Sequence, residues 1–144
     1  MINTALQVAY ALLGSLGFGL LFNVGGSALP LSALGGGVGW GTFLAVSALS
    51  GRKVLAFFLA SAVLSVYAEA VAHRRGDPVT IYLVPALIPL VPGSGMYYTV
   101  YEVIQGNPER ATALFLETFS IAFVIALGVA LASSMAALVR RARK

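Results

Sequence analysis

Five apolar runs, separated by short polar stretches, dominate this chain. They cover residues 5–22, 30–49, 54–71, 81–103 and 111–139. A run of about 20 apolar residues has the length of a helix that crosses the hydrocarbon core of a bilayer. Only 10% of the 144 residues are charged and the mean hydropathy is +0.92, whereas soluble domains carry about 25% charged residues. The sequence therefore predicts an all-α polytopic integral membrane protein, a single membrane domain with four or five transmembrane segments.

The scarcity of reactive side chains limits the chemistry that the chain can carry out. Cysteine is absent and there is one histidine. A disulfide framework, a thiolate nucleophile, a cysteine-based metal site and a histidine cluster are thereby excluded. No pairing of a nucleophile with a base is recognisable in the sequence. We therefore expect no enzymatic activity, no cofactor and no metal.

The positive charges favour a lipid surface over nucleic acid as their partner. The net charge is +4, but four of the nine basic residues directly follow the last apolar run, at Arg140, Arg141, Arg143 and Lys144. Basic residues in that place orient membrane helices and bind anionic lipid head groups. We expect the lipid bilayer, and no nucleic acid, as a partner.

The fourth apolar run is interrupted near its middle. It carries Pro85 and Pro89 and then breaks at the sequence Pro92-Gly93-Ser94-Gly95. Each proline removes a backbone donor and clashes with the preceding helical turn. About 11 residues remain on each side, roughly 16 Å of helix or half of a bilayer's hydrocarbon thickness. The run reads either as two half-helices meeting near the midplane, where transporters place substrate sites, or as a proline-kinked span with only a packing role.

The start of the second half-helix is the predicted substrate site. Gly93 and Gly95 allow backbone angles that are closed to other residues. If the helix begins at Ser94, the first amides lack intrahelical partners and lie at the positive end of the helix dipole, where a carboxylate binds well. No lysine or arginine lies within the apolar runs to do this instead. Tyr97 and Tyr98 follow within a turn and could cover the bound group.

Two further polar features carry alternative interpretations. Asn23, directly after the first run, reads as a helix C-cap, with a role as substrate ligand as the alternative. Beyond the break, helical spacing places polar side chains on one face, which predicts a surface toward a cavity or another chain, or else a helix lying in the membrane interface. The members of that face are Ser94, Tyr98, Tyr101, Glu102 and Gln105.

Three carboxylates within or beside the apolar runs are candidates for proton coupling. Glu117 lies a turn or two inside the last run and is expected to be the most buried. It is the first candidate for the proton-sensitive group, and Glu102 is the second. A charge at such a place costs at least about 2.5 kcal/mol unless it is paired, protonated or hydrated. An inter-subunit hydrogen bond is the alternative role for Glu117. Glu69 and His73 are spaced i, i+4 and form either an interfacial pair or a proton relay.

The second run contains an unusual density of glycine. Gly35 and Gly39, and likewise Gly37 and Gly41, form two overlapping GxxxG pairs. Such pairs let membrane helices approach closely. Because each glycine also costs up to about 1 kcal/mol of helix propensity, the segment is expected to be unwound or pressed against the break. Together with an alanine ridge on the last run, it is the predicted interface of a homo- or hetero-oligomer.

Several of these motifs together resemble the threonine/serine exporter family. The resemblance lies in Phe22-Asn23-Val24, in the glycine-rich second run, and in Ile88-Pro89-Leu90-Val91-Pro92-Gly93 followed by Tyr97 and Tyr98. It covers about Gly19 to Arg141 and matches the smaller, C-terminal half of that family. The larger half, which some members carry in the same chain and others in a second subunit, is lacking in this sequence.

The resemblance implies a function, a partner and a location. It implies a small subunit of a gradient-driven exporter of threonine and serine or of dicarboxylates, in a bacterial-type inner membrane. Its partner would be the larger subunit, further copies of itself, or both, and its substrate a small anionic or zwitterionic carboxylate. The alternatives are a scaffold subunit that does not transport and a channel whose polar stripe lines the pore.

The number of crossings sets the side on which the N-terminus lies. With five crossings, six basic residues (Arg74, Arg75, Arg140, Arg141, Arg143 and Lys144) share one side and three (Arg52, Lys53 and Arg110) share the other. The positive-inside rule then places the C-terminus in the cytoplasm and the N-terminus outside. If the fourth run instead enters and returns, both termini lie inside. An Asn3→Cys variant should react with an impermeant maleimide added outside the cell, and a protected cysteine would contradict the five-crossing arrangement.

Overall fold

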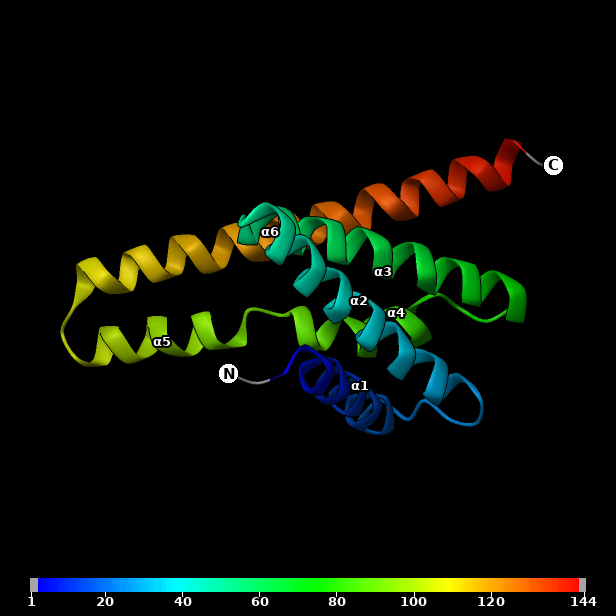
Figure 1. The fold of residues 1–144 in the computed structure, drawn as a ribbon, viewed down its shortest axis with the longest axis horizontal. Coiled ribbons are helices and arrows are strands. Elements are labelled where there is room, and N and C mark those ends of the chain that lie inside the picture. The colour runs from blue at the N-terminus through cyan, green and yellow to red at the C-terminus, as the bar shows by residue number, and fades with distance from the viewer. Residues whose placement is uncertain (1–2, 143–144) are drawn as a thin grey trace.

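The computed structural model describes residues 3–142, except for the side chains of 140 and 141, and this part of the chain is helical throughout (Figure 1). The elements are α1 (Thr4–Leu21), α2 (Ala28–Ser50), α3 (Lys53–Arg75), α4 (Thr80–Leu87), the 3-10 helix η1 (Ile88–Leu90), α5 (Gly93–Ile104) and α6 (Pro108–Ala142). Four helices are long and apolar enough to cross a membrane, and the pair of α4–η1 with α5 makes a fifth candidate. The predicted all-α membrane fold is confirmed. The basic side chains of the C-terminal tail lie outside the described residues.

The first three helices end in left-handed residues. The backbone of Asn23 has a φ of 59°. Its amide donates to the carbonyl of Leu20 at 3.0 Å, and the amide of Val24 donates to that of Gly19 at 2.9 Å. These bonds satisfy carbonyls that the end of α1 would leave unpaired. Gly51 and Gly76 end α2 and α3 in the same conformation.

Helix α2 forms the centre of the packing because glycine lets its neighbours approach. Gly35 faces Ala86 of α4 and Leu64 of α3, whereas a Cβ atom on Gly36 would lie 2.7 Å from that of Ser15 in α1. Gly37 and Gly39 are buried as well. Of the two expected alternatives, the structure shows the second. Helix α2 is not unwound, and Gly39 packs against Leu90 of η1, directly before the break. Close packing on several sides compensates for the poor helix propensity of glycine.

The expected inter-chain role of this glycine segment is also corrected. Gly35, Gly36, Gly37 and Gly39 are covered by side chains of α1, α3, α4 and η1 of the same chain. Gly41 lies farther out, with its nearest neighbour, Val8, at 3.9 Å from an added Cβ. The surface that would serve an oligomer is therefore already used within the fold.

The core lies where α3, α4, η1 and α6 meet. Its members are mostly alanine and leucine, with Tyr82 as the largest fully buried side chain. Small residues let α3 and α6 run close together, since a Cβ on Gly128 would stand 2.6 Å from the carbonyl oxygen of Phe58. Hydrogen bonds between helices add to this packing, such as Tyr67 Oη to the carbonyl of Leu31 at 2.8 Å.

The fourth apolar run is broken where the prolines predict. Pro85 lies inside α4, Pro89 lies in η1, and Pro92 directly precedes α5. The helix axes on the two sides differ by 50°. That change of direction is far smaller than the reversal of a re-entrant loop, and in Figure 1 α4 and α5 advance in the same general direction. The geometry is that of one broken span.

Beyond the break, α5 leaves the bundle and packs mainly against the first half of α6. We call α5 and this half of α6 the arm; Figure 1 shows it extending to the left of the other helices. The turns that join the long helices alternate between the two ends of the molecule, as five crossings require. In Figure 1 the α1–α2 and α3–α4 turns lie toward one end of the molecule, and the α2–α3 and α5–α6 turns lie toward the other.

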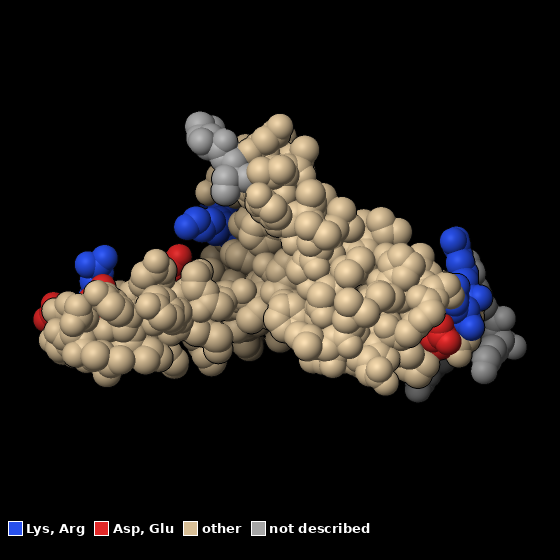
Figure 2. Space-filling view, turned by 90° about the horizontal axis from the view of Figure 1, so that it is seen from below, with Lys and Arg blue, Asp and Glu red and all other residues tan. Residues whose placement is uncertain are grey.

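Charged side chains are confined to a few places on the surface. Figure 2 shows one face on which they gather at the two ends and beside a hollow next to the arm, while the rest carries no charge. Large apolar side chains are exposed on all four long helices and on α5. Such a surface suits lipid rather than water.

A substitution at Gly36 tests the close packing of α1 on α2. Gly36→Val places a side chain against Ser15 and the carbonyl of Ala11, and overpacking of this kind costs about 1–3 kcal/mol. We expect a lower midpoint of thermal unfolding in detergent, followed by circular dichroism. Gly17→Val, within α1 and with nothing near its Cβ, is the matched control. Equal loss of stability in both variants would contradict this packing.

Candidate functional site

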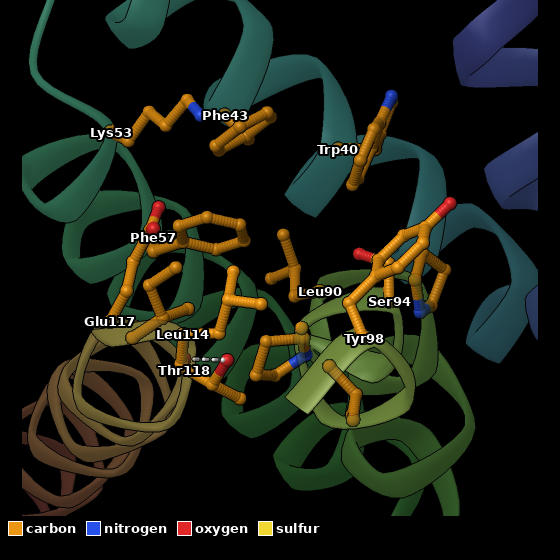
Figure 3. Close-up of a pocket in the computed structure, with 15 residues that line it drawn as sticks. Trp40, Phe43, Lys53, Phe57, Leu90, Ser94, Tyr98, Leu114, Glu117 and Thr118 are labelled. Carbon is orange, nitrogen blue, oxygen red and sulfur yellow. Dashed lines mark hydrogen bonds between the residues drawn. The ribbon is translucent and has the colours of Figure 1, made fainter. Parts of the chain in front are cut away.

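A cavity of about 420 Å³ lies at the break between η1 and α5. Its walls come from α2, α3, η1, α5 and α6, so that segments far apart in the sequence meet there (Figure 3). Its volume falls within the range of small-molecule sites, about 300–1,000 Å³. The polar and charged members of the lining are Lys53, Ser94, Tyr98, Glu117 and Thr118, with Trp40 beside them.

The first turn of α5 presents free backbone donors to this cavity. The helix begins at Gly93, whose amide donates to the carbonyl of Val91 at 2.8 Å. The amides of Ser94 and Gly95 have no acceptor within the described chain, and both residues line the cavity. The sequence predicts that the first amides of this helix are free; those of Ser94 and Gly95 are, and that of Gly93 is not.

The two glycines at the break differ in their surroundings. Neither has a positive φ, so neither uses the backbone angles that glycine alone allows. Gly93 has open space around its Cβ position, whereas at Gly95 that position meets the side chain of Thr118, with the Cβ of Thr118 3.2 Å away. Thr118 is buried and its hydroxyl donates to the carbonyl of Leu114 at 2.6 Å. Gly95 therefore lets α5 approach α6 beside the cavity.

Tyr98 lines the cavity and Tyr97 does not. The side chain of Tyr97 is 65% exposed, and its ring contacts that of Tyr98 edge-on at 5.3 Å. Tyr97 can steady Tyr98 from outside but does not reach the space that a ligand would fill. Asn23 likewise lies outside the cavity, exposed in the α1–α2 turn, where its conformation fits the C-cap interpretation.

Two opposite charges reach the cavity from neighbouring helices. Lys53 is the first residue of α3, and Glu117 belongs to α6. Figure 3 shows both on one side of the cavity, with Ser94 and Tyr98 on the other. The prediction that Glu117 would be the most buried carboxylate was wrong: it is exposed, while Glu69 and Glu102 are each only 7% exposed.

Lys53 was missed by sequence reasoning. It directly precedes the third apolar run, and from the sequence it counts only as one of the basic residues on one side of the membrane. Its position as the first helical residue hints that it stays close to the helix bundle, but only the packing of α3 on α6 brings it to the break. The argument that no basic side chain is available for a carboxylate therefore does not hold for the folded chain.

The remaining proton-coupling candidates lie elsewhere. The carboxylate of Glu102 accepts from Asn107 Nδ2 at 2.9 Å and pairs with Arg110 Nε at 3.2 Å, which holds the α5–α6 turn together. Glu69 and His73 line a second cavity of about 350 Å³ at the end of α3, together with Asp77. Only Glu117 of the four candidates faces the cavity at the break.

Comparison with known proteins agrees with this architecture. The family model described as "Threonine/Serine exporter, ThrE" matches residues 7–135. The chain belongs to the threonine/serine exporter family. An uncharacterized protein of Haemophilus influenzae is 26% identical over 139 residues, which cover 91% of this chain and 47% of that protein. The chain thus spans about half the length of this curated relative, and no solved structure matches it.

The close approach at Gly95 can be tested through the single tryptophan, Trp40, which lines the cavity. Gly95→Val should push α5 away from Thr118 and admit water, and so shift the fluorescence emission of Trp40 to longer wavelength. Gly93→Val adds the same side chain where there is room and should leave the emission unchanged. A shift in the Gly93 variant with none in the Gly95 variant would contradict the described contact.

Proposed function

We propose that this exporter-family chain is a small subunit that works with a larger subunit, with further copies of itself, or with both. It exports small amino acids such as threonine and serine, or dicarboxylates, and an ion or proton gradient drives this transport. The match covers 47% of the Haemophilus influenzae relative, and in this proposal a larger subunit corresponds to the part of that relative outside the match. The membrane is a bacterial-type inner membrane. The C-terminus lies in the cytoplasm, because the side of the C-terminus carries six basic residues and the other side three, and the side with more basic residues faces the cytoplasm.

The observation that carries this proposal is the cavity at the broken span. Helix starts with unpaired amides bind anions, because the N–H groups and the helix dipole both favour negative charge. The amides of Ser94 and Gly95 offer such a site for the substrate carboxylate. Broken helices serve the same purpose in other transporters, where their ends point at the substrate.

Glu117 is the proposed proton-sensitive group. Its carboxylate faces the cavity, where Lys53 of α3 and Tyr98 of α5 are the other titratable groups. A carboxylate that is charged when substrate is bound and protonated when the site is empty would couple the movement of protons in one direction to the movement of substrate in the other. Glu102, Glu69 and His73 are less suited because they lie away from this cavity.

Glu117→Gln should therefore abolish the pH dependence of transport while leaving the assembled complex intact. The measurement is uptake of radiolabelled threonine into inverted vesicles across a range of pH values. Glu109→Gln, at the exposed start of α6, removes a carboxylate outside the cavity and serves as control. Wild-type pH dependence in the Glu117 variant would rule this role out.

Reconstitution tests the function itself. Proteoliposomes with this chain alone, and with a larger subunit of the same family, are assayed for transport of threonine and succinate. We expect transport with the partner present, reduced at least tenfold when the cavity is filled by Ser94→Trp. Full transport in that variant would make the chain a scaffold subunit, and gradient-independent flux of ions would make it a channel.

A further inference from the structure

The cavity at the break carries one positive and one negative side chain, and neither is neutralised by the protein. Lys53 and Glu117 have no ion pair or hydrogen bond within residues 3–142. In contrast, Asp77 pairs with Arg75 and Glu102 pairs with Arg110. A charge beside apolar walls is costly without a counter-charge or water. The unpaired charges at the cavity are thus available to a ligand.

We propose that Lys53 and Glu117 determine which class of carboxylate this cavity accepts. Glu117 binds the ammonium group of an amino acid, and Lys53 supplies the positive charge that a second carboxylate would need. The proposal rests on the proposed function and identifies the residues that set its substrate class.

The balance of charge favours a zwitterion. The charges of the Lys53 and Glu117 side chains sum to zero, as do those of the ammonium and carboxylate groups of an amino acid. A dicarboxylate would instead bring two negative charges to a cavity that already holds Glu117. Like charges at short range repel each other. With Glu117 charged, the cavity therefore prefers the amino acid.

The arrangement of the walls fits the same ligand. Glu117 lies across the cavity from Ser94 in Figure 3. A carboxylate on the amides of Ser94 and Gly95 can place its ammonium group toward the opposite wall, where Glu117 is the acceptor. Phe43, Phe57 and Leu90 line the rest of the space, so they offer an apolar surface to a short side chain.

The two charges should have opposite effects on selectivity. Removing the negative charge with Glu117→Gln leaves Lys53 unopposed, which weakens the binding of threonine and strengthens that of succinate. Removing the positive charge with Lys53→Met weakens succinate further and spares threonine. A change that merely loosened the fold would shift both ligands in the same direction.

Binding can be followed through Trp40 fluorescence of the full chain in nanodiscs, with equilibrium dialysis of radiolabelled ligand as a second readout. The ligands are L-threonine, succinate and 3-hydroxybutyrate, which has a carboxylate and a hydroxyl but no ammonium group. We expect the wild-type chain to bind threonine at least about tenfold more tightly than 3-hydroxybutyrate, since a charged hydrogen bond is at stake. Glu117→Gln should abolish that difference and keep the affinity for 3-hydroxybutyrate.

The controls are Glu109→Gln and Arg52→Met, which remove the same charges outside the cavity lining, and both should behave as the wild-type chain. Equal affinity of the wild-type chain for threonine and 3-hydroxybutyrate would overturn the inference and leave the proposed site standing. An unchanged ratio of threonine affinity to succinate affinity in Glu117→Gln would also overturn the inference and leave the proposed site standing. If none of the three ligands binds in either readout, the proposed site itself is wrong, and the inference falls with it.

Discussion

The rest of the structure depends on the missing backbone donors of Pro89 and Pro92. Without them the fourth apolar run cannot continue as one helix, so η1 ends at Leu90 and a new helix begins at Gly93. The 50° change of direction carries α5 away from α2 and α4 and onto α6. Both the cavity and the unpaired amides that face it result from this single interruption.

The close packing of α2 supports the break from the other side. Leu90, the last residue of η1, is 1% exposed and packs near Gly39 and Leu64. Because small residues on α2 and α3 hold this end of the broken span, the position of the cavity wall is fixed by packing rather than by a loop. The arm on the far side is held by Gly95 against Thr118 and by the Glu102–Arg110 pair at its turn.

Local sequence patterns predict the helices and the break, but not what the break faces. Apolar runs set the long helices because only a fully hydrogen-bonded backbone is stable in lipid, and the prolines locate the interruption within a residue or two. The exposure of Glu117, the presence of Lys53 at the cavity and the difference between Gly93 and Gly95 all depend on how α3, α5 and α6 pack together. Spacing along the chain carries little information on such contacts between distant segments. Family resemblance extended the prediction to function, yet it did not identify which polar side chains share one space.

The central claim is that substrate occupies the cavity at the start of α5. The chain has no cysteine, so one introduced thiol reports on one position without background. The most direct measurement is the rate at which Ser94→Cys reacts with a soluble maleimide, with and without saturating substrate, in the reconstituted exporter. We predict strong protection at position 94 and none for Gly25→Cys in the exposed α1–α2 turn. Equal reaction rates at position 94 with and without substrate, in a complex that still transports it, would contradict this account.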